Sequence, residues 1–122
     1  MVNVSSTDIA STIFEPLVAQ AAGSAYIGRM TEADAMRMMA ALGQPVRLAV
    51  LNALARAGSE GIASSDLADL VGVPRNLMSA HLAVLSKAEA VASRKDGRSV
   101  VYVMRTEAIS DLLTYLSDLI GR

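Results

Sequence analysis

The chain has 122 residues, which is enough for one hydrophobic core but leaves little room for a second domain. Hydrophobic residues make up 52% and aromatic residues only 3%, so the core must consist of aliphatic and methionine side chains, which favours helices. The sequence contains no cysteine and one histidine, His81, which excludes thiolate metal sites, disulfides, CxxC redox motifs and cysteine nucleophiles. Because it also lacks a phosphate-binding loop, paired carboxylates and a nucleophile beside a base, we predict neither an enzyme nor a cofactor.

The net charge is small but unevenly distributed. A net charge of −1 and a pI of about 5.7 argue, on their own, against a nucleic-acid-binding protein. Residues 74–105, however, hold six basic and two acidic residues, a net charge of +4, so all other residues together carry −5. One short stretch therefore carries the positive field, as binding to a polyanion requires.

The N-terminal sequence predicts no export. It has neither the basic start nor the apolar run of a signal peptide, which predicts a cytoplasmic protein. The longest uncharged run, Pro16–Gly28, is too short for a bilayer, so no membrane span is predicted.

Residues 1–30 are expected to form a helical N-terminal extension, capped by Ser6 or Thr7 and interrupted by Pro16. Its apolar face would consist of Ile9, Ile13 and Leu17, which we expect at a dimer interface. Residues 31–122 are expected to form one further domain.

The next predicted helix extends from Glu32 to Leu42 with Thr31 as its N-cap. Its apolar face is predicted to consist of Met36, Met39 and Ala40. Three methionines within this helix are also compatible with a soft-metal site, but core or interface packing is the more common role, and we assign them to the interface. A third helix is predicted from Pro45, with helical spacing of its apolar residues Val46, Ala49, Val50, Ala53 and Leu54.

Two helices separated by a short glycine-containing turn follow. The first is predicted over Ser65–Val71, capped by Ser64 or Ser65, and the second over Arg75–Ala88 after Pro74. The apolar positions of the first helix are Leu67, Leu70 and Val71. The buried face of the second is expected to consist of Leu77, Met78, His81 or Leu82, and Leu85. This spacing is typical of a helix-turn-helix motif.

A β-hairpin is predicted next because the hydrophobic period changes from 3.6 to 2. The strands Val91–Lys95 and Arg98–Met104 would be joined by Asp96-Gly97, placing Val91 opposite Tyr102 and Ser93 opposite Val100. The basic residues near the tip would be Arg94, Lys95 and Arg98.

The chain is predicted to end in a helix over Glu107–Ile120, with Thr106 as its cap. Its apolar stripe is wide and consists of Ile109, Leu112, Leu113, Leu116, Leu119 and Ile120. A surplus of this size favours a twofold dimer interface, for which we select Ile109, Leu113, Leu116 and Ile120. The alternative is that these residues close the monomer core.

This order of elements is that of a winged helix-turn-helix, and three sequence motifs add to it. Residues 41–48 read ALGQPVRL, residues 79–85 read SAHLAVL, and residues 96–102 read DGRSVVY. The first two are similar to the ALADPTRL junction and the S-x-HLxxL recognition helix of the ArsR/SmtB family of bacterial repressors, and the third resembles that family's wing. The resemblance covers residues 32–120 and implies a mainly helical, dimeric winged helix-turn-helix protein with a small hairpin.

The resemblance implies a homodimer that represses transcription by placing two recognition helices in successive major grooves of a palindromic operator on double-stranded DNA. Arg75 and Asn76 would reach guanine and adenine edges, and Ser79 follows on the same face. The alternative for Arg75 and Asn76 is solvation of a helix start. His81 is either close to the DNA backbone, as in the family, or a hydrogen-bonded core residue.

The basic hairpin residues Arg94, Lys95 and Arg98 would bind phosphates or enter the minor groove. Their alternative role is to protect a solvated hairpin edge from pairing with another chain.

The sequence departs from the family at its sensing sites. No cysteine lies on the first helix of the helix-turn-helix, and the last helix offers Asp111 and Asp118 without a histidine, so we predict no metal site and leave the effector open. Glu89 occupies a position where the family usually has glycine. A left-handed backbone there would cost a non-glycine residue on the order of 1 kcal/mol.

The sequence thus predicts a DNA-binding transcriptional regulator, most simply a repressor. A winged-helix protein-interaction module or anti-regulator without DNA affinity is the alternative, since the acidic pI permits it.

Overall fold

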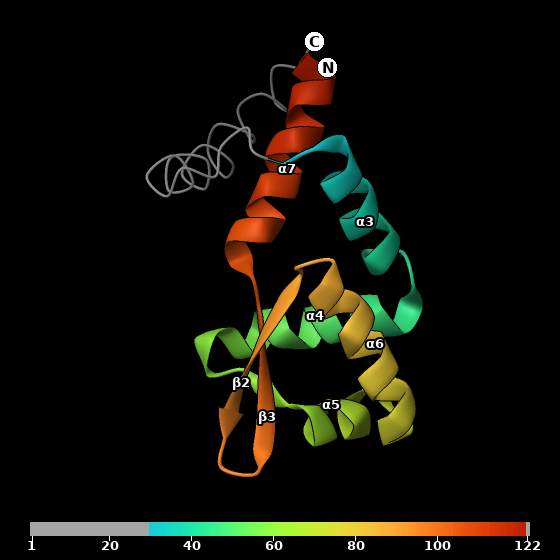
Figure 1. Cartoon of the computed structure of the whole chain (residues 1–122), viewed down its shortest axis with the longest axis vertical. Coiled ribbons are helices and arrows are strands. Elements are labelled where there is room, and N and C mark those ends of the chain that lie inside the picture. The colour runs from blue at the N-terminus through green and yellow to red at the C-terminus, as the bar shows by residue number, and fades with distance from the viewer. Residues whose placement is uncertain (1–29, 122) are drawn as a thin grey trace. The chain divides into compact units, whose positions relative to one another are not determined.

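A computed structural model describes residues 30–121 of the chain. The predicted N-terminal helix with Ile9, Ile13 and Leu17 lies outside this range. The elements, drawn in Figure 1, are α3 (Glu32–Leu42), α4 (Pro45–Ala57), the 3₁₀ turn η2 (Gly58–Glu60), β1 (Ile62–Ala63), α5 (Ser64–Val71), α6 (Arg75–Lys87), β2 (Val91–Asp96), β3 (Ser99–Met104) and α7 (Thr106–Gly121). The predicted fold class, mainly helical with a small hairpin, is confirmed. The chain divides into two compact units, one formed by Met36–Arg105 and the other containing residues 30–35 and 106–121.

Helix α3 begins at the predicted cap but buries a different face. The Asp34 backbone N–H donates to Thr31 Oγ1 at 3.0 Å, and the Thr31 backbone N–H donates to Asp34 Oδ2 at 3.2 Å, which forms a reciprocal capping box. The predicted apolar face of Met36, Met39 and Ala40, whose methionines we assign to the interface, is exposed. The buried residues are Ala35, Met38 and Ala41. Both sets have helical spacing, so the period alone could not choose between them.

Helix α4 also begins with a side-chain cap. Gln44 accepts a hydrogen bond from the Arg47 backbone N–H on Oε1 at 2.9 Å, and Pro45 occupies the first turn, where its missing N–H costs nothing. Its buried stripe consists of Val50, Leu51 and Leu54.

Helices α5 and α6 form the predicted helix-turn-helix. Gly72 ends α5 in the left-handed conformation (φ +81°), and its N–H donates to the Ala68 carbonyl. The predicted serine cap of α5 was wrong, because Ala63 is the N-cap and both serines are already helical. Leu77, which was expected to be buried, is 50% exposed, and the apolar Leu70 of α5 is 67% exposed.

The sheet has three strands in the order β1-β3-β2, so β3 is central. In the hairpin, Val91 pairs with Met104, Ser93 with Tyr102 and Asp96 with Ser99. The predicted pairing was therefore wrong by two residues, and the two-residue loop is Gly97-Arg98 rather than Asp96-Gly97. Gly97 has φ +64°, which suits the first central position of a type II′ turn. Because the shift is two residues, each side chain keeps its predicted face.

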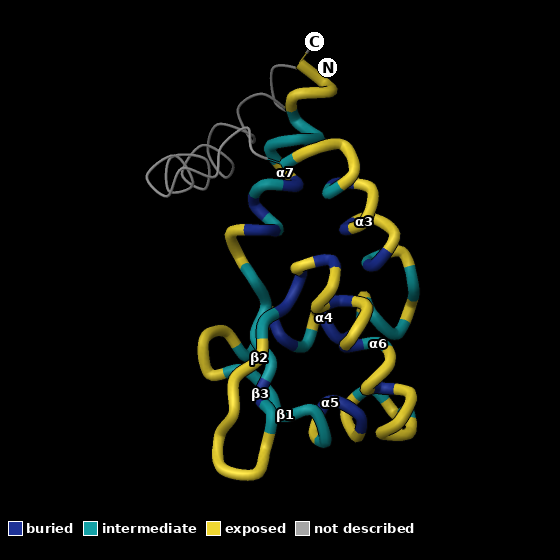
Figure 2. The backbone as a smooth tube through the Cα atoms, viewed as in Figure 1, coloured by how far each residue is buried: buried dark blue, intermediate teal, exposed yellow. Residues whose placement is uncertain are grey.

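The core of the Met36–Arg105 unit lies between its helices and the sheet, where Figure 2 shows short buried stretches of α4, α5 and α6 alternating with exposed ones. Its fully buried large side chains are Met38, Val50, Leu54, Leu67, Met78, Leu82 and Leu85. Among residues 30–121 no single helix is long and apolar enough to cross a membrane; the segments Glu32–Leu42 and Pro45–Glu60 reach that length and hydropathy only in combination, and they are bent by 95° at their break.

Candidate nucleic-acid interface

Helix α6 presents its N-terminal polar residues to solvent because its apolar residues are on the other side. Met78, Leu82 and Leu85 recur at intervals of three or four residues and are buried. Arg75, Asn76, Ser79 and the rest of the outward face are therefore exposed. The start of α6, helix α5 and the tip of the hairpin lie at the same end of the Met36–Arg105 unit (Figure 1).

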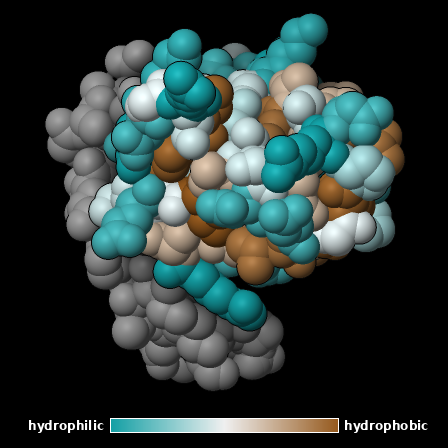
Figure 3. Space-filling model, turned by 90° about the horizontal axis from the view of Figure 1, so that it is seen from below, coloured by the Kyte–Doolittle hydropathy of each residue, from teal (hydrophilic) through white to brown (hydrophobic). Residues whose placement is uncertain are grey.

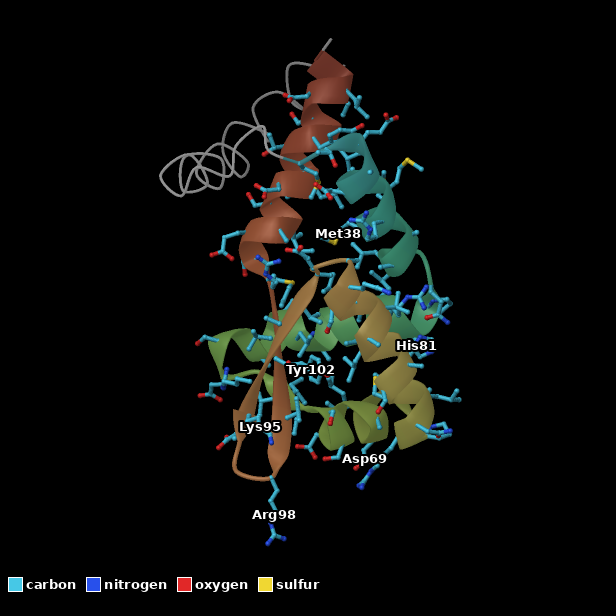
Figure 4. The ribbon with its side chains drawn as sticks, viewed as in Figure 1. Met38, Asp69, His81, Lys95, Arg98 and Tyr102 are labelled. Carbon is cyan, nitrogen blue, oxygen red and sulfur yellow. The ribbon has the colours of Figure 1, made fainter. Side chains whose placement is uncertain are left out.

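The hairpin tip adds positive charge to this end. Lys95 and Arg98 are exposed, and Arg98 extends beyond the tip (Figure 4). Within the described part of the chain, neither side chain has a hydrogen-bond or ion-pair partner. The Met36–Arg105 unit contains nine basic and five acidic residues, so it carries +4. Phosphates are the ligands that such uncompensated cations attract.

Arg94 is engaged differently from its two neighbours. Its Nη2 donates to the Glu60 carbonyl at 2.8 Å, and its Nη1 donates to the Ser59 carbonyl at 3.4 Å. Both carbonyls belong to η2, so this guanidinium attaches the hairpin to the turn after α4. Arg94 was predicted to contact phosphate, but in this structure the two carbonyls already accept hydrogen bonds from its guanidinium.

His81 is half-buried and faces helix α4. Its Nδ1 lies 3.3 Å from Arg47 Nη1, and Arg47 Nε donates to the Ala41 carbonyl at 2.6 Å. This geometry matches the hydrogen-bonded alternative for His81. We assigned no role to Arg47 from the sequence. Its spacing of three, four and seven residues from the buried Val50, Leu51 and Leu54 places it on the buried face of α4, which could have indicated a structural role.

The lower end of the unit is a mixed surface. Figure 3 shows hydrophilic side chains projecting among hydrophobic ones on this face. One of the polar residues is Asp69 of α5, an exposed carboxylate that would repel phosphate. The lower end of the unit therefore carries negative as well as positive charge.

The turn from α6 into the hairpin has the expected left-handed residue. Glu89 has φ +64° and is the only non-glycine residue in the described range with positive φ. Arg105 Nη1 donates to Glu89 Oε1 at 2.6 Å and to the Glu89 carbonyl at 3.3 Å. This ion pair and hydrogen bond join the turn after α6 to the end of β3.

Several residues predicted for the dimer interface are exposed on their own units. Met36 and Met39 on α3 are 61% and 40% exposed, and Leu113 and Ile120 on α7 are likewise 42% and 86% exposed. Ile109 and Leu116 are half-buried. In residues 30–121, no group of three histidine or carboxylate side chains is placed to hold a metal ion.

Known proteins are similar to this chain in sequence and in fold. A family described as a helix-turn-helix domain matches residues 42–94. The nodulation protein NolR of Rhizobium meliloti is 31% identical over 83 residues, a region that spans 68% of this chain and 66% of NolR. Among solved structures, an ArsR-like transcriptional regulator from Rhodococcus sp. RHA1 is 26% identical and superposes with a TM-score of 0.65, covering 73% of this chain and 81% of its own.

The chain is similar in sequence and in fold to winged helix-turn-helix transcriptional regulators of the ArsR family. A further ArsR-like structure, the homodimeric winged helix-turn-helix DNA-binding domain of Mb0332 from Mycobacterium bovis, is 26% identical with a TM-score of 0.59, and covers 73% of this chain and 79% of its own. In family terms, α5 and α6 are the helix-turn-helix and β2–β3 is the wing. This assignment confirms the family resemblance of the sequence motifs.

Proposed function

We propose that this chain represses transcription as a homodimer that binds a palindromic operator in double-stranded DNA. One observation carries the proposal: the exposed start of α6 and the free cations of the hairpin tip share one end of a unit with charge +4. Arg75 and Asn76 would contact guanine and adenine edges in the major groove, with Ser79 one turn further along. Lys95 and Arg98 would bind phosphates beside it.

The dimer part of the proposal is supported by apolar residues exposed on α3 and α7. Side chains as large as Met36 and Ile120, 61% and 86% exposed, are costly to leave in water and are commonly buried on a partner subunit. Residues 31–122 would then contain the DNA-binding domain with its C-terminal dimerisation helix, and residues 1–30 would add to the interface. Light scattering should give twice the chain mass, and Ile120→Asp should shift it toward the monomer mass. A wild-type monomer would contradict this part.

The DNA-binding part is tested by selecting fragments of the source genome on the full-length protein and measuring their affinity over a salt series. If Lys95 and Arg98 of both subunits each neutralise one phosphate, the logarithm of the binding constant should fall with the logarithm of the salt concentration, with a slope of about −3.5 or steeper. Absent or salt-insensitive binding would contradict the proposal. Recovery of a stable protein partner in place of DNA would favour the interaction-module alternative.

A further inference from the structure

Arg47 connects three helical segments of the Met36–Arg105 unit. Its backbone N–H is capped by Gln44 at the start of α4, and its Nε donates to the Ala41 carbonyl near the end of α3. Its Nη1 lies 3.3 Å from Nδ1 of His81, in the middle of α6. A guanidinium has donors only, so His81 Nδ1 must be the acceptor, and the ring proton must be on Nε2.

The surroundings of this contact suit a structural element better than a ligand site. Both side chains are half-buried, and Arg47 continues the buried stripe of α4. His81 lies five residues after Asn76 on α6, next to the buried Leu82. The guanidinium is planar and its donors are fixed in direction, so one side chain sets the position of α6 against both neighbouring segments.

We propose that Arg47 and His81 are a positioning pair that fixes the direction of the recognition helix, and through it the placement of Arg75 and Asn76, rather than residues that contact DNA. The proposal rests on the proposed DNA binding for its effect on affinity. The pair itself is a property of the free protein, which allows the two ideas to be tested separately.

The first experiment uses the free, full-length protein. Because His81 is the only histidine in the sequence, the NMR spectrum of protein labelled with ¹⁵N in its histidine ring contains the signals of one residue. In alkaline buffer, where an imidazole is neutral, the spectrum should show the proton on Nε2, and Arg47→Lys should move the Nδ1 resonance. A proton on Nδ1, or no response to Arg47→Lys, would overturn the pair whether or not the protein binds DNA.

The second experiment measures affinity for a selected genomic fragment over a salt series. Arg47→Lys and His81→Ala should each weaken binding about tenfold, as expected for one hydrogen bond from a charged donor, and the double variant should be no weaker than either single one. The salt slope should stay at the wild-type value because no phosphate contact is lost. His81→Gln, which keeps an acceptor, should recover part of the loss.

Arg56 provides the matched control because it is an exposed arginine in the last turn of the same helix. Arg56→Lys should leave affinity unchanged. If Arg47→Lys keeps wild-type affinity while Arg47→Ala lowers the salt slope by about one for each subunit, Arg47 contacts phosphate and the positioning role is refuted. Additive losses in the double variant would also refute it. A wild-type protein that binds no DNA would instead refute the proposed function, and the imidazole spectrum would still decide on the pair.

Discussion

Replacing Gly61 with alanine should destabilise the protein far more than the loss of a small loop residue suggests. Gly61 has φ +72° and ψ −175°, a conformation that is essentially restricted to glycine and costs other residues about 1–3 kcal/mol. A Cβ at this position would lie 2.5 Å from the Tyr102 carbonyl oxygen, and 2.7 and 2.8 Å from Cγ1 of Val101 and Val103. The oxygen is a backbone atom of the central strand β3, and the two valine side chains are β-branched and stiff, so the clash cannot be relieved by a flexible side chain.

Gly58 separates the backbone term from the clash. It has similar angles, φ +63° and ψ −144°, but a Cβ there would meet no atom within 4 Å. Gly58→Ala should therefore cost only the conformational term, whereas Gly61→Ala should cost about 1–3 kcal/mol more, the usual range for overpacking. The extra loss would separate β1 from β3 and displace the η2 carbonyls that hold Arg94.

Urea unfolding at one fixed protein concentration measures the difference. With a slope of about 1.5 kcal/mol/M, a gap of about 2 kcal/mol places the Gly61→Ala midpoint roughly 1 M below that of Gly58→Ala. The concentration must be held constant because a dimer's apparent stability depends on it. Equal midpoints for the two variants would refute the reasoning that β3 leaves no room at Gly61.

Three further predictions concern the left-handed turn at Glu89, the helix cap at Gln44 and the arginines of the hairpin. Glu89→Gly should be more stable than Glu89→Ala by about 1 kcal/mol in urea unfolding, because both lose the Arg105 ion pair but only alanine keeps the left-handed strain; equal stability would argue against strain at this turn. Gln44→Ala should lower the free energy of unfolding by about 1 kcal/mol through loss of the helix cap, and an unchanged midpoint would show the cap to be dispensable. Arg98→Ala should reduce the salt slope of DNA binding by about two in a dimer, whereas Arg94→Ala, whose guanidinium binds η2 carbonyls, should weaken binding with little change in slope; the reverse pattern would exchange their roles.

Several helix boundaries, though not the start of α5, were predictable because individual residues mark them. Thr31 caps α3, Pro45 fits only the first turn of α4, and Gly72 supplies the left-handed end of α5. The exposure of Arg75 and Asn76 also followed from the helical period of α6. These features depend on neighbours within one turn, which the sequence displays directly.

Features that depend on distant neighbours were not predictable in the same way. The hairpin loop contains one glycine that fits either central position of a two-residue turn, and only the partner strand fixes the choice as Gly97-Arg98. Strand β1 is too short to have a period of its own and exists through its pairing with β3. Arg47 and His81 are 34 residues apart in sequence, so their contact depends on how α4 and α6 are placed in the fold.

The most direct test of the central claim is the affinity ratio between a selected operator and a scrambled duplex of equal length at one salt concentration. Wild-type protein should prefer the operator by a factor of about 10³ or more. The double variant Arg75→Ala, Asn76→Ala should reduce this ratio toward one while keeping its affinity for the scrambled duplex, because the phosphate contacts of the hairpin remain. A double variant that keeps the wild-type ratio would contradict the account of α6 as the element that reads DNA sequence.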